Sequence, residues 1–201
     1  TSAHATPSGA TLTIQSPITD NGGATSLTKA GNGTLVLNGI NTYTGATTVN
    51  QGVLEFDSAT GNLGSGTVRV SGGTLRWGTG NIADISAGRT VELLGSSVYV
   101  TSGTSGNIFG VGSTFDVGAN NVTLSNSIGN NGYGGLTKLG TGSLTLSAAP
   151  TYTGATVISQ GSMTFASIAP NTTEALHLIQ TSGITSGTVS ATIQNGLNVK
   201  S

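Results

Sequence analysis

The chain has 201 residues, of which only 6% are charged, and six basic against seven acidic side chains leave a net charge of −1. A nucleic-acid-binding protein needs a dense set of Lys and Arg side chains, so this charge balance excludes that class. Cysteine is absent, which excludes disulfides, thiolate nucleophiles and Cys-ligated metals. No apolar run approaches the roughly 20 residues of a membrane-spanning helix.

Short strands are predicted along most of the chain, because pairs of apolar residues separated by one residue recur at steps of 19 to 24 residues. In a strand, two such side chains point to the same face. The first column of pairs is Leu12/Ile14, Leu35/Leu37, Leu54/Phe56, Leu75/Trp77, Val98/Val100, Val122/Leu124, Leu144/Leu146 and Met163/Phe165. A second column between them is Thr47/Val49, Val68/Val70, Val91/Leu93 and Phe115/Val117. Two columns in phase predict an all-β fold, a parallel β-solenoid of about eight turns.

A longer repeat lies over this short period, since residues 26–56 and 135–165 align without a gap at an offset of 109 residues, with about 16 of 31 positions identical. We interpret the shared positions as one structural unit, in which the tyrosines brace a corner. They are Leu27, Lys29, Gly31, Gly33, Tyr43, Gly45 and Gly52 in the first copy, and Leu136, Lys138, Gly140, Gly142, Tyr152, Gly154 and Gly161 in the second. Residues 1–201 are predicted to form a single solenoid domain.

The shared string LTKxGxGxLxLxxxxTYTGATxxxQGxxxF resembles the passenger-associated transport repeat of bacterial autotransporters. The resemblance implies a right-handed parallel β-helix that is secreted across the outer membrane to the cell surface. It also implies a precursor with an outer-membrane β-barrel, and repeats that support folding and export. The chain ends at Asn198–Ser201 without the strand pattern of such a barrel, so we expect it to be a passenger or a piece of one.

The stacked register predicts which outward side chains become neighbours, because adjacent strands of a ladder lie about 5 Å apart. Glu55 and Arg76, and likewise Arg69 and Glu92, are expected to pair as ions between turns. Outward positions of the first column are Glu55, Arg76, Tyr99, Thr123, Thr145 and Thr164, and those of the second are Thr48, Arg69, Glu92 and Asp116. Glu92 beside Asp116 is the sharpest candidate for a binding site, either as an acid and nucleophile pair or as ligands of a divalent cation. Because Arg69 already offers Glu92 a partner, the structural interpretation of this carboxylate pair is favoured over both.

The hypothesis favoured by these features is a non-enzymatic, surface-exposed rod that acts in adhesion, display or fibre assembly. No catalytic residue, metal or cofactor is predicted. Possible partners are other copies of the chain, joined end to end through open solenoid edges, and a host or matrix glycan or protein. The alternative is a polysaccharide-binding or polysaccharide-active β-helix, although thirteen charged residues spread along the chain do not suggest a charged groove. Ice binding is a third hypothesis that the threonine content raises.

Overall fold

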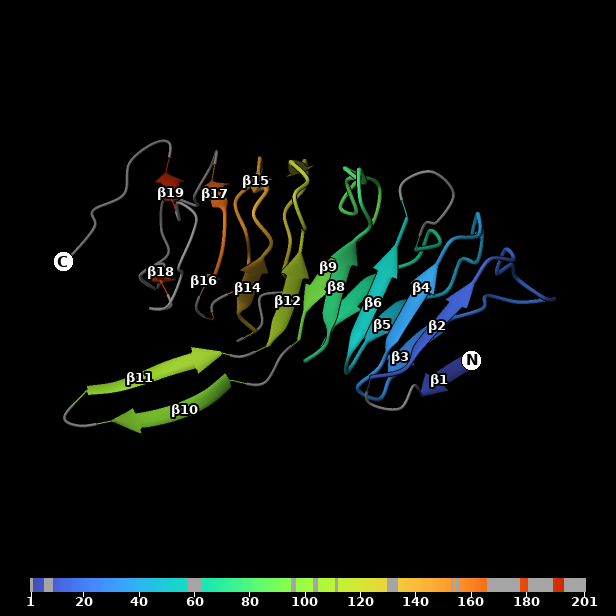
Figure 1. Ribbon diagram of the computed structural model, residues 1–201, viewed down its shortest axis with the longest axis horizontal. Coiled ribbons are helices and arrows are strands. Elements are labelled where there is room, and N and C mark those ends of the chain that lie inside the picture. The colour runs from blue at the N-terminus through green and yellow to red at the C-terminus, as the bar shows by residue number, and fades with distance from the viewer. Residues whose placement is uncertain are drawn as a thin grey trace.

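The fold is known from a computed structural model, which describes residues 2–5, 9–57, 63–94, 97–102, 105–110, 112–129, 134–152, 154, 156–165, 178–180 and 190–193. Every regular element among these residues is a β-strand. Most strands stack side by side along one axis, with the first, Ser2–Ala5, and the last, Ser190–Ile193, at opposite ends of the stack (Figure 1). The prediction of a parallel β-solenoid is confirmed, with about six turns rather than eight.

Three sheets run along the stack. The five-stranded sheet contains, in order, β1 (Ser2–Ala5), β3 (Leu27–Ala30), β5 (Thr47–Val49), β7 (Val68–Val70) and β9 (Val91–Leu93). The eight-stranded sheet contains β2 (Thr11–Ile14), β4 (Thr34–Leu37), β6 (Val53–Phe56), β8 (Thr74–Trp77), β12 (Ser113–Asp116), β14 (Leu136–Leu139), β16 (Thr156–Ile158) and β18 (Leu178–Gln180). The four-stranded sheet contains β13 (Val122–Leu124), β15 (Ser143–Leu146), β17 (Ser162–Phe165) and β19 (Ser190–Ile193).

Neighbouring strands of all three sheets are parallel, and the register places like residues above like. Leu54 of β6 is opposite Leu75 of β8, for example, and Leu144 of β15 is opposite Met163 of β17. Side chains alternate between buried and half-buried along each of these strands. The period of two residues therefore divides each strand into a core face and an outer face, as the sequence predicts.

The interior of the eight-stranded sheet carries a stack of aromatic rings. The ring centroids of Phe56 and Trp77 are 5.2 Å apart, and those of Trp77 and Phe115 are 5.4 Å apart. All three side chains are buried, and the indole Nε1–H of Trp77 donates to the Ala83 carbonyl at 2.9 Å. Tilted and edge-on ring pairs at this distance add to the hydrophobic gain of burial.

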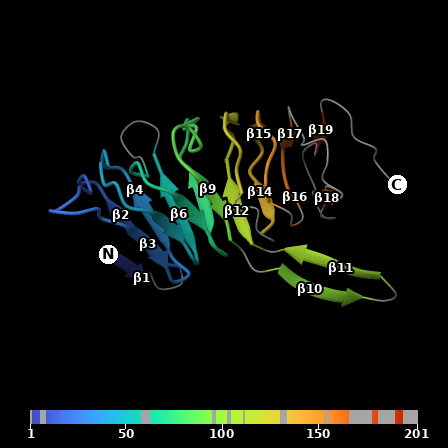
Figure 2. The ribbon, with the colours of Figure 1, turned by 180° about the vertical axis from the view of Figure 1, so that it is seen from behind.

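A hairpin interrupts the solenoid and accounts for one of the turns that the sequence overcounted. β10 (Ser97–Ser102) and β11 (Ser105–Gly110) pair only with each other, in antiparallel fashion. Both views show the hairpin outside the stack (Figures 1 and 2). The expectation that Val98 and Val100 form a turn of the first column is therefore wrong, and so is the place of Tyr99 in the outer file. A strand of a hairpin has the same alternation as a strand of a coil, so spacing alone cannot separate the two.

The two repeats lie on different faces of the solenoid. β3 of the first copy belongs to the five-stranded sheet, whereas its equivalent β14 belongs to the eight-stranded sheet, next to β12. In the same way β4 is in the eight-stranded sheet and its equivalent β15 is in the four-stranded sheet. Local stacking is nevertheless the same, because Leu27 is opposite Thr47 and Leu136 is opposite Thr156. The first column of apolar pairs thus continues from one sheet into another.

Polar side chains join the coil before the hairpin to the coil after it. Asp84 accepts hydrogen bonds from the backbone N–H and hydroxyl groups of both Ser86 and Ser125, which is 41 residues away. Asn120 Nδ2 donates to the Gly78 carbonyl at 2.9 Å, and the Ser113 hydroxyl donates to the Val70 carbonyl at 2.7 Å. We call this set of contacts the seam. The seam holds the coil before the hairpin directly against the coil after it.

We expect Asp84→Ala to lower the free energy of unfolding by about 2 kcal/mol, because it leaves four donors without their acceptor, and the two of Ser86 are partly buried. Arg69→Ala is the control, since it breaks one half-buried surface ion pair, with Glu92, that contributes at most about 1 kcal/mol. Burial raises the pKa of Asp84, but the bonds from Ser125 and Ser86 outweigh burial and lower the pKa below its ordinary 3.8. Its contribution is therefore present above pH 3.8 and is lost as the pH falls through the folded-state pKa. Urea unfolding at neutral and acid pH measures both effects, and equal losses for the two variants at neutral pH would contradict this role of the seam.

Candidate functional site

The feature that the two repeats share most closely is a buried lysine. Lys29 and Lys138 are both 0% exposed, at inward positions of β3 and β14. The ammonium of Lys29 donates to the carbonyl oxygens of Ala30 at 2.9 Å, Gly31 at 2.6 Å and Gln51 at 3.1 Å. The first two acceptors lie on the same coil of the solenoid as Lys29, and the third lies on the next coil. The lysine therefore ties two successive coils together through backbone oxygens.

The second copy rebuilds this arrangement on another face of the solenoid. The ammonium of Lys138 donates to the carbonyls of Gly140 at 2.6 Å, Gly142 at 2.6 Å and Gln160 at 3.0 Å. A lysine ammonium has three donors, and in each copy three carbonyls take them. We call these two sets of residues the lysine cages: Lys29 with Ala30, Gly31 and Gln51, and Lys138 with Gly140, Gly142 and Gln160.

Each lysine cage is closed by a glycine that no other residue can replace without movement. Gly52 and Gly161 have φ angles of 64° and 67°, in the left-handed region that favours glycine. A Cβ on Gly52 would lie 2.8 Å from the Lys29 ammonium nitrogen and closer still to two backbone oxygens. A Cβ on Gly161 would press on the carbonyl oxygens of the lap below it. In each copy the glutamine of the Gln-Gly pair thus supplies a carbonyl acceptor, and the glycine after it leaves room for the other carbonyls of the cage.

The environment of each cage disfavours the charged form of its lysine. Burial lowers the pKa of Lys138 from 10.5 to about 8, and the carboxylate of Asp116 opposes that shift. Burial also lowers the pKa of Lys29. A neutral amine has an attacking lone pair, and lysines with depressed pKa values act as nucleophiles in some enzymes. Here the nitrogen is fully buried and bonded to three carbonyls, so the geometry is that of a structural joint.

A second shared element is a buried tyrosine that lies four residues before the next strand of its repeat and contacts the threonine that begins that strand. The Tyr43 hydroxyl is 2.5 Å from the Thr47 hydroxyl, which donates to the Leu63 carbonyl at 2.9 Å. In the second copy the Tyr152 hydroxyl is 2.8 Å from that of Thr156. Burial raises the pKa of Tyr43 from 10.0 to about 12, a shift that the bond from Thr47 and the charge of Arg89 oppose. The sequence analysis predicted Thr47 as a member of the second column but did not predict that Thr47 or Thr156 would contact the tyrosines, although both copies contain the pair.

The other shared glycines lie where laps approach closely. Gly45 and Gly154 donate their N–H groups to the carbonyls of Thr25 and Gly134 on the preceding lap, at 2.9 and 3.1 Å. Buried Leu27 and Leu136 begin the equivalent strands β3 and β14.

We expect the stability of the protein to pass through a maximum near pH 10, because the lysine and the tyrosine act in opposite directions. The folded chain releases the Lys138 proton at a lower pH than the unfolded chain, so stability rises between pH about 8 and 10.5. Tyr43 has the opposite sign: its contribution is present below pH 10.0 and is lost as the pH rises through about 12. Denaturant unfolding across this range tests both groups. Lys138→Met should remove part of the rise and Tyr43→Phe part of the fall, and a flat profile in the parent protein would contradict both shifts.

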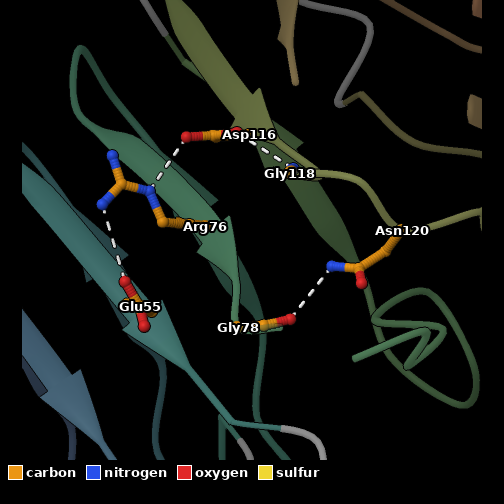
Figure 3. Close-up of polar contacts among 6 residues, drawn as sticks. All are labelled: Glu55, Arg76, Gly78, Asp116, Gly118 and Asn120. Carbon is orange, nitrogen blue, oxygen red and sulfur yellow. Dashed lines mark hydrogen bonds and ion pairs between the residues drawn. The ribbon is translucent and has the colours of Figure 1, made fainter. Parts of the chain in front are cut away.

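The outer faces carry ion pairs between successive coils (Figure 3). Arg69 Nε is 2.7 Å from Glu92 Oε2, and an Arg76 nitrogen is 3.5 Å from Glu55 Oε2. Both predicted pairs are confirmed. All four side chains are half-buried, so each pair contributes little to stability and mainly favours one register.

The expected neighbourhood of Glu92 and Asp116 is wrong. Glu92 lies on β9 of the five-stranded sheet, whereas Asp116 lies on β12 of the eight-stranded sheet and is opposite Arg76. Its carboxylate is 2.9 Å from Arg76 Nε (Figure 3). The hairpin is the cause, because removing its strands from the count places β12 on β8 and not on β9. The two carboxylates therefore form no joint site.

The threonines predicted in file are neighbours, but on the four-stranded sheet. Thr123, Thr145 and Thr164 are opposite one another on β13, β15 and β17. They do not continue the file of Glu55 and Arg76, which belongs to the eight-stranded sheet. Among the described residues no group of three or more acidic or histidine side chains is placed to hold a metal ion. In that same part of the chain no helix has the length and apolar character needed to cross a membrane.

Comparison with known proteins gives these repeats a family. Residues 27–56 and 136–164 match the model of the passenger-associated-transport-repeat, and each match contains one lysine cage with its tyrosine. The chain is also 32% identical over 178 residues to the adhesin BmaC autotransporter of Brucella suis biovar 1 (strain 1330). It is an autotransporter passenger domain.

The match covers 79% of this chain but only 5% of the length of the Brucella adhesin. No solved structure matches it. The passenger domain is secreted to the bacterial cell surface, as its resemblance to the transport repeat predicts.

Proposed function

We propose that the passenger domain is a rod-forming segment of a surface adhesin, and that its coils space or display an adhesive region away from the cell. The lysine cages are the observation that carries the proposal. Each copy of the repeat uses its most polar buried side chain to fasten one coil to the next, and so serves the continuity of the rod. The name of the Brucella relative, an adhesin, supports the same role.

The same cages suit export through a narrow pore, because the third carbonyl of each cage comes from the next coil and the cage is complete only when that coil has folded. Gln51 closes the cage of Lys29, and Gln160 closes that of Lys138. One coil alone cannot offset the entropy of ordering about 20 residues, so stability comes from the interfaces between coils. We therefore propose that the repeats support folding after export from a precursor with an outer-membrane β-barrel.

A deletion that keeps the coils in phase tests the rod. Removing residues 27–135 from the natural full-length protein places the second repeat at the position of the first. Both copies pair with the next coil in the same register, so the stacking there is preserved. We expect normal amounts of protein at the cell surface and reduced adherence to host cells, because the displayed region is nearer the membrane.

Two outcomes would contradict the proposal. Unchanged adherence of the shortened protein would show that the segment is not needed as a spacer. Cleavage of a polysaccharide by the purified passenger domain would favour the enzymatic alternative. The double variant Lys29→Met/Lys138→Met tests the export role separately from the spacing role. It keeps the length of the rod, and we expect it to lower the amount of protein at the cell surface.

A further inference from the structure

The hairpin of β10 and β11 is the one element of the described chain that stands apart from the coils. It leaves the stack after β9 and returns at β12, and both views show it clear of the three sheets (Figures 1 and 2). Its strands are six residues long, whereas those of the coils have three or four. A solenoid does not need this excursion, because the seam already closes the stack behind it.

The backbone of this hairpin has two open edges. Ser97–Ser102 pair with Ser105–Gly110 and with no other strand among the described residues. In an antiparallel pair, alternate residues of each strand turn their N–H and C=O groups away from the partner. Such a row of unsatisfied groups is a template for another strand. An isolated two-stranded hairpin is also only marginally stable in water, so a third strand would stabilise it.

The sequence of the hairpin lacks the residues that normally protect an edge. Natural edge strands carry Lys, other charges or Pro, which prevent pairing with a second chain. Residues 95–112 contain no charged residue and no proline, and they include Val98, Tyr99, Val100, Ile108 and Phe109, all of types that favour strands. By contrast, the outer faces of the coils carry Glu55, Arg69, Arg76, Glu92 and Asp116.

We propose that the hairpin is a self-recognition element, and that β10 pairs edge to edge with β10 of a second copy of this chain. β10 contains Val98, Tyr99 and Val100 in succession, whereas β11 contains two glycines and an asparagine, which are disfavoured in strands. A second copy is the occupant that the charge pattern favours, because identical uncharged strands can meet about a two-fold axis without like-charge repulsion. The hairpin stands outside the stack, so two rods can lie beside each other while their hairpins form one four-stranded sheet. This lateral contact differs from end-to-end association through the coil edges, and it does not depend on the adhesive role proposed above.

Charge complementation tests this pairing while keeping the whole chain. One variant carries Tyr99→Lys with Thr101→Lys, and the other carries Tyr99→Glu with Thr101→Glu. Sedimentation velocity over a concentration series should show a dimer for the parent chain. Each variant alone should have a dimer dissociation constant raised about tenfold or more, and an equal mixture should restore the dimer. Thr123→Lys with Thr145→Lys adds the same charge to the four-stranded sheet and should leave the dimer unchanged.

Three results would overturn the proposal. A parent chain that stays monomeric over the whole series overturns the proposal. A dimer that survives in both charged variants also overturns it, because the contact must then lie elsewhere, as at the coil ends. Variants that remain monomeric when mixed overturn it as well, since opposite charges on paired edges would attract. Thermal unfolding of each variant shows that the coils are intact, so loss of the dimer cannot be assigned to unfolding.

Discussion

Gly161→Ala is expected to destabilise the passenger domain by at least about 4 kcal/mol, the range reached when a substitution forces backbone to move. The Cβ would lie 2.7 Å from the carbonyl oxygens of Gly140 and Thr141 and closer still to that of Gly142. Real Cβ atoms do not approach this closely. The substitution therefore separates two coils at the point where the cage of Lys138 closes, and it also places a side chain in left-handed backbone.

Gly80→Ala is the matched control for this experiment. Gly80 has a φ of 78°, so alanine incurs the same left-handed backbone cost, but a Cβ there meets nothing within 4 Å. We expect a loss of about 1 to 2 kcal/mol. Denaturant unfolding of the two variants gives the difference between them, which measures the close approach of the coils. Equal losses would show that the coils can separate at Gly161 without cost.

Lys138→Met is expected to lower the free energy of unfolding by about 3 kcal/mol. Methionine preserves the length of the apolar stem but donates no hydrogen bond, so the carbonyls of Gly140, Gly142 and Gln160 lose their shared partner. Relief of the buried charge offsets part of this loss. Deprotonation of the native lysine has the opposite effect, because the neutral amine keeps two donors while the buried charge is removed.

The neighbouring outward position provides the control. Thr137 lies on the same strand and is half-buried, so Thr137→Met adds a methionine without touching the cage and should change stability by no more than about 0.5 kcal/mol. Lys29→Met should repeat the loss in the first copy, where the ammonium also has three carbonyl partners. A Lys138→Met protein as stable as its parent would mean that the carbonyls find other donors and that the cages do not fasten the coils.

The strand pattern was predictable because each coil repeats a local rule. Leu54 with Phe56 and Leu75 with Trp77 alternate with polar residues, and each pair became one buried face of a parallel strand. The inward place of Lys29 was also within reach, since it follows Leu27 by two residues in a strand whose inward faces are otherwise apolar. Its repetition in the second copy made a structural role the natural interpretation.

The sequence alone determined that the chain is an all-β stack of coils with two equivalent repeats, because inward side chains must recur once per lap. Only the tertiary structure decided which coils are neighbours in the stack. Val98 and Val100 alternate like any coil strand, yet they pair backwards in a hairpin, and this moves Asp116 from Glu92 to Arg76 and turns the second repeat onto another face. Alternation shows which side of a strand is apolar, whereas the identity of the neighbouring strand depends on hydrogen bonds to residues about 20 positions away, or about 40 across the hairpin.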